Sequence, residues 1–273
     1  MPLTIKLKNE SSIPLEVDSI TMEQVQTQIA EDVARTPIFR GNEKPELGEY
    51  FDVSGSATDD HTIVWEGDLT KVKLIGSRLT HGKVQVEGSV GMHLGAEMTG
   101  GEIVVNGNAE DWVGAEMKGG CIRINGNVRH MLGAAYRGST KGMTGGEILV
   151  DGNAGNEVGN SMRRGLIAVS GNIGDVAGAA MIAGSILVFG ETGIRHGAGM
   201  KRGTIALFNG ESAPPMLPTF KKAITFRPLF MRFYLQHLKE LGFPVAEEHF
   251  DVSFHRYLGD FLELGKGEIL VAA

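Results

Sequence analysis

The most constraining feature of the sequence is a glycine-marked unit that repeats along its middle. Each unit opens with one glycine and carries a second glycine seven residues later. With a looser copy at Gly67 included, the opening glycines are spaced 21, 19, 19, 26, 19 and 19 residues apart, a period of 19 with two insertions. Helical-pair repeats need about 33–47 residues, so the unit predicts one turn of a β structure. The glycine pairs are Gly88 and Gly95, Gly107 and Gly114, Gly126 and Gly133, Gly152 and Gly159, Gly171 and Gly178, and Gly190 and Gly197.

Each unit closes with two apolar residues that flank a variable one. Such period-two patterns of β-branched residues are typical of strands with one buried face. Short strands between glycine turns predict a mainly β chain, a right-handed parallel β-helix of about seven coils. Coils about 4.8 Å apart would form a rod on the order of 30 Å long. The pairs are Ile103/Val105, Ile122/Ile124, Ile148/Val150, Ile167/Val169, Ile186/Val188 and Ile205/Leu207.

Two other columns recur at fixed positions in the units. The first is Met98, Met117, Met143, Met162, Met181 and Met200. The second is Asn108, Asn127, Asn153 and Asn172. Methionine could bind a soft metal, but we favour flexible side chains stacked inside the coil. We likewise favour asparagines that hydrogen-bond along the rod over a ligand site. The glycines suit turns with positive φ and close approach of neighbouring coils.

The repeat divides the chain into three predicted parts: a capping segment at 1–65, the glycine-repeat β-helix at 66–210, and a tail at 211–273 with a helix at about 228–241. Open strand edges at both ends of such a rod need covering. The first part contains an alternating strand at residues 3–7 and then a helix. A capping box from Thr21 to Gln24 should begin this helix, with Met22, Val25 and Ile29 on one face.

The tail helix is apolar on most of its sides, so we expect it to need two partners, one of which could be another chain. The residues between the paired strand positions point outward and become apolar in the later units. Either the tail of this chain or a neighbouring subunit should cover them. They are Gln85, Val104, Arg123, Leu149, Ala168, Leu187 and Ala206.

Composition limits the partners and the compartment. The net charge of −7 repels phosphate backbones, so we expect no nucleic-acid partner. No uncharged run is long enough to span a bilayer, and residues 1–12 lack the apolar stretch of a secretory signal. The single cysteine, Cys121, can form no internal disulfide and cannot hold an iron–sulfur cluster. These features predict a cytoplasmic protein.

No catalytic signature is present. The sequence lacks a Walker A motif, a G-x-S-x-G elbow and an H-E-x-x-H motif, and its glycines do not lie in a βαβ unit. We therefore predict no catalytic, cofactor-binding or metal-binding residue on this chain. The best remaining cluster is His249, Asp251, His255 and Asp260, which we interpret as a polar tail packed on the rod rather than a site. The insertion at 137–141 is either a partner-contacting loop or a neutral surface loop.

The repeat resembles the C-terminal domain of the large subunit of glutamate synthase. Nearly the whole chain is similar to the C subunit of formylmethanofuran dehydrogenase, on GNEKPELGEYFDVSG at 41–55, the units at 67–210, RPLF at 227–230 and GDFLELGKGEIL at 259–270. The flanking segments favour the second family. A glutamate-synthase origin would also require amidotransferase and flavin domains, which this sequence lacks.

That resemblance implies a non-catalytic scaffold subunit in one-carbon metabolism, in methanogenesis or methylotrophy. Its partners would be A-, B- and D-type subunits. In the dehydrogenase these would carry a molybdenum or tungsten pterin, iron–sulfur clusters and a metal-dependent amidohydrolase site. A bacterial formyltransferase/hydrolase complex uses a similar subunit, and moves a formyl group from tetrahydromethanopterin to a carrier of the methanofuran or methylofuran type before releasing formate. We favour the bacterial complex. The alternative is a self-standing β-helix enzyme, such as an acyltransferase or a polysaccharide-active protein, or a glutamate-synthase-like domain.

Overall fold

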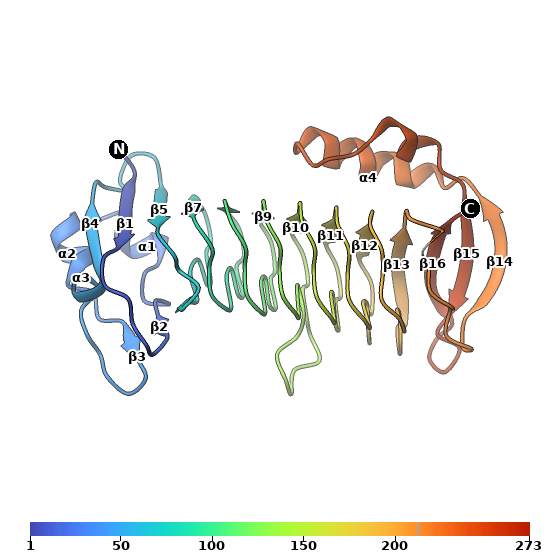
Figure 1. Cartoon of the computed structure of the whole chain (residues 1–273), viewed down its shortest axis with the longest axis horizontal. Coiled ribbons are helices and arrows are strands. Elements are labelled where there is room, and N and C mark those ends of the chain that lie inside the picture. The colour runs from blue at the N-terminus through green and yellow to red at the C-terminus, as the bar shows by residue number, and fades with distance from the viewer. Residues whose placement is uncertain (212) are drawn as a thin grey trace.

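The computed structural model describes residues 1–211 and 213–273. The chain is mainly β, with one large mixed sheet, a small second sheet and a few short helices (Figure 1). In spatial order the large sheet contains β14 (Lys221–Phe226), β15 (Phe254–Gly259), β16 (Lys266–Ala272), β13 (Arg202–Leu207), β12 (Ser185–Val188), β11 (Leu166–Val169), β10 (Glu147–Val150), β9 (Cys121–Ile124), β8 (Glu102–Val105), β7 (Lys83–Glu87), β5 (Thr62–Glu66), β1 (Leu3–Leu7) and β4 (Phe51–Ser54). The small sheet contains β3 (Phe39–Arg40), β2 (Leu15–Glu16) and β6 (Val72–Lys73). The helices are α1 (Met22–Val25), α2 (Ala30–Ala34), α3 (Leu47–Tyr50), α4 (Leu229–Glu240) and the 3-10 helix η1 (Glu247–Asp251).

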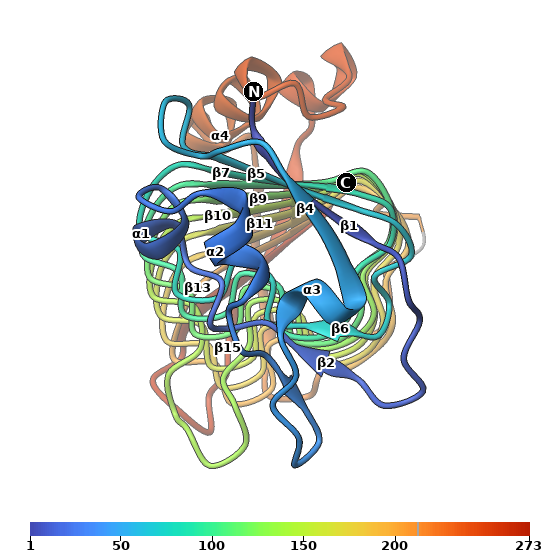
Figure 2. The same ribbon diagram turned by 90° about the vertical axis from the view of Figure 1, so that its left-hand side faces the viewer.

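The strands from β7 to β13 pair in parallel, each with the next one in the sequence. Ile103 of β8 lies opposite Ile122 of β9, which in turn lies opposite Ile148 of β10 across the longer insertion. The sheet is open, because β4 and β14 form its two edges through antiparallel pairs. A second line of parallel bridges crosses the same units, and Figure 2 shows these units stacked one behind another. The bridges join Leu69, Val90, Ala109, Val128, Ala154, Ile173 and Thr192 in succession.

The main core lies inside the stacked units. Because successive side chains of a strand point to opposite faces, the two apolar residues of each closing pair turn inward together. Ile122 and Ile124 have no exposed surface, and neither do Ile186 and Val188. The fully buried methionines fill the space behind these strands. The core is therefore continuous from one unit to the next.

A second apolar cluster lies between the outer face of the large sheet and α4, which runs across β10 to β13 (Figure 1). Met231, Leu235 and Leu238 are buried, and their i, i+4, i+7 spacing places them on one face of the helix. The sheet contributes Leu149, Ala168, Leu187 and Ala206 to the same cluster. The tail of this chain, rather than a neighbouring subunit, therefore covers the apolar part of the outward column.

Arg123, on the polar part of that column, holds the end of α4. Its guanidinium donates hydrogen bonds to the carbonyl oxygens of Leu241 and Gly242, at 2.7 and 2.9 Å, and forms an ion pair of 2.9 Å with Asp151. Carbonyl groups in the last turn of a helix lack partners within the helix. The arginine supplies such partners and links the tail to β9.

The first helix of the chain differs from the sequence prediction. It is split into α1 and α2, and Thr21 has extended backbone angles but makes no side-chain capping bond. The predicted capping box is therefore wrong. The Glu23 carboxylate instead accepts a hydrogen bond from the hydroxyl of Thr80. The prediction that Ile29 lies on the buried face is also wrong, since its side chain is 63% exposed where the chain turns between the two helices.

Candidate functional site

The two glycines of each unit meet different steric demands. Gly178 has φ +65°, and a Cβ there would lie 2.6 Å from the Cδ1 atom of Ile205. Gly171 is outside the left-handed region, but a Cβ there would lie 2.4 Å from Oδ1 of Asn153 and 2.7 Å from the carbonyl oxygen of Gly152. Positive φ thus belongs to the second glycine of every pair; among the first glycines only Gly88 shares it. Packing within the chain occupies the space beside these glycines, so they form no open phosphate cradle.

The six methionines of the predicted column are all fully buried. Each methyl group packs where a glycine later in the chain leaves room. A Cβ at Gly120 would lie 2.6 Å from the Cε atom of Met98, and one at Gly146 would lie 2.6 Å from that of Met117. Over residues 1–211 and 213–273, no group of three or more His, Cys, Asp or Glu side chains could hold a metal ion. The buried methionine methyl groups pack against these later glycines.

The asparagine column forms hydrogen bonds along the stack. The side-chain oxygen of Asn127 accepts the backbone N–H of Asn153 at 2.8 Å, and that of Asn153 accepts the N–H of Asn172 at 2.7 Å. Each asparagine thus binds the backbone of the next unit. A typical intramolecular hydrogen bond contributes about 0.5–1.5 kcal/mol to stability, so the repeated position adds one such bond between each pair of neighbouring units.

A second polar ladder was not predicted from the sequence. The Asp111 carboxylate accepts the N–H of His130 at 2.9 Å, and Nδ1 of His130 accepts the N–H of Asn156 at 2.9 Å. The side-chain oxygen of Asn156 accepts the N–H of Asp175, and the Asp175 carboxylate accepts the N–H of Ile194. A signal for it exists, because these residues lie four positions after successive opening glycines. Their chemical types differ, and only their shared ability to accept a hydrogen bond unites them.

The four tail residues singled out in the sequence do not converge. Asp260 is buried and accepts the N–H groups of Gly199 and Leu262, at 3.0 and 2.9 Å. Burial alone would raise the pKa of this carboxyl, but the backbone hydrogen bonds outweigh it and lower the pKa. Asp260 therefore stabilises the turn after β15. Its hydrogen-bond partners, Gly199 and Leu262, are not among the other three residues.

His249 packs on aromatic rings in the second cluster. Its ring centroid lies 4.8 Å from that of Phe189 and 5.3 Å from that of Phe208. Burial lowers the pKa of this histidine, against the opposing charge of Glu248. The ring of His249 thus packs against these aromatic side chains while its Nδ1 accepts the backbone N–H of Ala246 at 3.1 Å.

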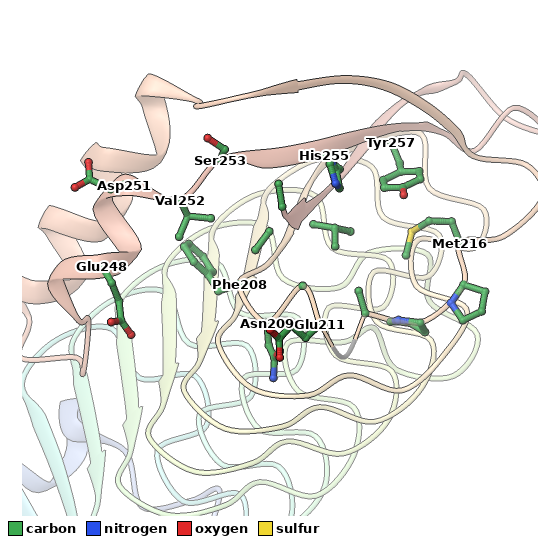
Figure 3. A pocket seen from close by; sticks show the side chains of 17 residues that line it. Phe208, Asn209, Glu211, Met216, Glu248, Asp251, Val252, Ser253, His255 and Tyr257 are labelled. Atoms are coloured by element: carbon green, nitrogen blue, oxygen red, sulfur yellow. The ribbon is translucent and has the colours of Figure 1, made fainter.

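A wide groove of about 1360 Å³ opens beside the last strands and holds the other two residues (Figure 3). His255 and Tyr257 reach it from β15, Glu248 and Asp251 from η1, and Asn209 from the segment after β13. No lysine or arginine lines it among the described residues.

The described residues of the groove include polar groups, but they show no pairing of a nucleophile with a base. Nδ1 of His255 is 2.7 Å from the hydroxyl of Thr225, outside the lining, and Asp251 is paired with Arg227 at 2.9 Å. Within the described residues, neither side chain orients the other. General-base catalysis requires a base within hydrogen-bond reach of its target and held in place by a third group, and the described lining residues show no such set.

The insertion is anchored at its base and exposed at its tip. The Tyr136 hydroxyl lies 3.1 Å from Nδ1 of His93, whose ring stacks on Trp112 at 5.5 Å. Burial, then the charges of Glu97 and Glu116, raises the pKa of Tyr136 to about 12. Residues 137–141 are all exposed and form a protruding loop below β10 (Figure 1). Both interpretations of the loop, as a partner contact and as a neutral surface, stay open.

The single cysteine is not an activated nucleophile. Burial raises the pKa of the Cys121 thiol to about 11, and the carboxylates of Glu147 and Glu102 add to this effect. The reactive form of cysteine is the thiolate, which is scarce at neutral pH with this pKa. Cys121 packs against the cluster beneath α4.

Comparison with known proteins identifies the family. Residues 70–240 match the GXGXG motif family. The chain belongs to the GXGXG motif family. Its homologues include the C subunit of molybdenum-containing formylmethanofuran dehydrogenase 1 from Methanothermobacter marburgensis, 41% identical over 88 residues that cover 32% of this chain and 22% of the relative. The C subunit of tungsten-containing formylmethanofuran dehydrogenase 2 from Methanococcus maripaludis is 39% identical over 92 residues, 34% of each chain. The chain thus spans between about a fifth and a third of the length of these curated relatives.

A solved structure matches from end to end. One chain in the crystal structure of the formyltransferase/hydrolase complex (FhcABCD) from Methylorubrum extorquens, in complex with methylofuran, superimposes with a TM-score of 0.90 and 32% identity. The match covers 99% of each chain. The family resemblance predicted from the sequence is confirmed by these relatives. Among the described residues, no helix has both the length and the apolar character needed to cross a bilayer.

Proposed function

We propose that this chain is the C-type, non-catalytic scaffold subunit of a formyltransferase/hydrolase complex or a formylmethanofuran dehydrogenase. The observation that carries the proposal is the match over 99% of both chains with a chain of the FhcABCD complex. We favour the formyltransferase/hydrolase complex, because the two dehydrogenase subunits described above match about a third of this chain. The complex would act on a formyl group that comes from the tetrahydromethanopterin pathway and is held on a carrier of the methylofuran type.

The scaffold role rests on a finer description of the fold, which is part of the proposal. Residues 66–210 form a right-handed parallel β-helix of about seven coils, between an N-terminal cap at 1–65 and the tail at 211–273. The 19-residue offsets in both lines of parallel pairing support it. In it, the paired glycines and the methionine column have purely structural roles. Such a rod is stiff because each coil bonds to both of its neighbours, and it can hold other subunits at fixed separations.

The reaction chemistry would then belong to the A-, B- and D-type partners. Any molybdenum or tungsten pterin, iron–sulfur cluster or hydrolase metal would be bound by those chains. This division agrees with the high pKa of Cys121 and with the absence of a catalytic arrangement at His255 in the described part of the groove. The single cysteine also supports a reducing, cytoplasmic setting.

The test is purification of the native assembly from the source cells through a tag on this chain. We expect co-purification of partner subunits in fixed ratios, formyl transfer from tetrahydromethanopterin to a methylofuran-type carrier, and release of formate. Metal analysis decides between the two assemblies, since molybdenum or tungsten with iron–sulfur clusters would identify the dehydrogenase. If the chain purifies alone and turns over a substrate without partners, the proposal is wrong and the self-standing enzyme is favoured.

A further inference from the structure

The exposed apolar side chains of this protein gather in one part of the chain. Of the thirteen large hydrophobic residues exposed among the described residues, eight lie between positions 224 and 264. Phe233 and Leu229 of α4 are 78% and 74% exposed, and Ile224 of β14 is 56% exposed. Scattered exposed apolar residues are normal in soluble proteins, but a concentration of them marks an interaction surface.

The strand next to these residues has an open edge. β14 is the last strand of the large sheet and pairs on one side with β15. Five of its six residues are exposed, and no other described segment bonds to its backbone. An edge of this kind presents unpaired N–H and C=O groups that can accept another strand. Leu229 follows the end of β14 by three residues, and Phe233 lies one helical turn further on the same side of α4.

The charge of this surface is opposite to that of the whole protein. Residues 221–241 contain five lysines and arginines but one acidic residue, while the chain carries a net charge of −7. Arg227 and Lys239 are paired with Asp251 and Glu247. Lys221, Lys222 and Arg232 have no described carboxylate within ion-pair distance.

We propose that the open edge of β14, together with Leu229 and Phe233, docks an extended segment of a partner subunit that carries both acidic and apolar side chains. The segment adds a strand to β14, sets its carboxylates against Lys221 and Lys222, and covers the apolar residues. A second copy of this chain is disfavoured, because its own face would bring the same positive charges. The inference rests on the proposed function, since it names where a scaffold of this kind holds a partner.

The test uses the native complex and two variants with matched controls. Lys221→Glu/Lys222→Glu reverses the charge of the edge, and Lys71→Glu/Lys118→Glu reverses two other exposed lysines. Phe233→Ser removes the exposed ring, and Ile29→Ser removes an apolar residue 63% exposed at the far end of the chain. All these side chains are exposed, and circular dichroism checks that each variant folds.

We expect both C-terminal variants to lose one partner subunit, with affinity reduced about tenfold or more, while both controls keep it. In the wild-type complex, a carbodiimide that joins amines to contacting carboxylates should link Lys221 or Lys222 to an aspartate or glutamate of that subunit. If the wild type assembles and the variants assemble equally well, the docking surface is wrong and the scaffold function stands. If the wild type has no partner, both proposals fail. Self-association of the isolated chain that Lys221→Glu/Lys222→Glu abolishes would overturn the partner-segment proposal in favour of a second copy.

Discussion

The substitution Gly171→Ala tests whether contact between neighbouring units limits the repeat. Its backbone lies outside the left-handed region, so alanine fits the local conformation and would ordinarily stabilise the protein by about 0.4–1 kcal/mol. The added Cβ, however, would lie 2.4 Å from Oδ1 of Asn153 and 2.7 Å from the carbonyl oxygen of Gly152. A Cβ atom essentially never lies within 3.0 Å of another nonbonded heavy atom, so the two units must separate.

The expected cost follows from what that separation weakens. Overpacking costs about 1–3 kcal/mol. The bond from the N–H of Gly171 to the carbonyl of Gly152, and the bond from the N–H of Asn172 to Asn153, each contribute about 1 kcal/mol. We therefore expect a net loss of about 2–4 kcal/mol. At about 2–4 °C for each kcal/mol, the midpoint of thermal unfolding should fall by about 5–15 °C.

Two other glycines separate contact from conformational strain. Gly138 has φ +90° and no atom within 4 Å of the place where a Cβ would lie, so Gly138→Ala carries strain without contact. This strain costs about 1–2 kcal/mol at most, in an exposed loop that can relax. Gly178→Ala carries both, although the Ile205 side chain it meets is flexible. Thermal and urea unfolding, followed by circular dichroism, should rank Gly171→Ala as more destabilising than Gly138→Ala. A Gly171→Ala protein as stable as the wild type would refute the argument.

Three further perturbations address the tail and the core. Leu235→Ala should lower the free energy of unfolding by about 2–5 kcal/mol and loosen α4 from β10–β13. Limited proteolysis should then cut the chain at α4 while the circular-dichroism signal of the sheet persists. Arg123→Met should raise hydrogen exchange at the end of α4, because it removes the two bonds to Leu241 and Gly242; unchanged exchange would contradict that role. Burial lowers the pKa of His196, despite the raising effects of a hydrogen bond to Gly193 and of the charge of Asp175. The stability that the neutral, buried His196 contributes is therefore complete above the unfolded pKa of about 6.5. It is lost as the pH falls toward the lower pKa of the folded state. The free energy of unfolding should therefore fall less between pH 7 and pH 5 in His196→Leu than in the wild type. Equal slopes of unfolding free energy against pH in the two proteins would exclude His196 as a cause of this pH dependence.

His196 also shows which part of the sequence pattern predicts burial. It lies six residues after Gly190, the position that holds Leu94 and Leu132 in earlier units. The structure places it 3% exposed, with Nδ1 accepting the N–H of Ala177 at 3.3 Å. The histidines of the chain share no column, so their own spacing says nothing about this burial. The apolar residues of the same column do predict it, because a shared column means a shared position in the stack.

The repeating part of this protein could be predicted from its sequence alone. The 19-residue spacing, the inward pairs such as Ile122 and Ile124, and the asparagine column all follow from local pattern, because each unit pairs with a near copy of itself in the next unit. The family could also be recognised from the sequence. In such a stack, a residue contacts the equivalent residue of the next unit, so the spacing of the repeat predicts the contact.

Contacts outside that period depended on three-dimensional packing. No spacing rule connects α4 with β10–β13, or Arg123 with Leu241, which is 118 residues away, because α4 is not a copy of the repeating unit. The pattern left two candidates for covering the outer column, and the packing of the folded chain selected the tail. The same packing left Leu229 and Phe233 exposed beside an open strand edge, because α4 turns Met231, Leu235 and Leu238 toward the sheet instead.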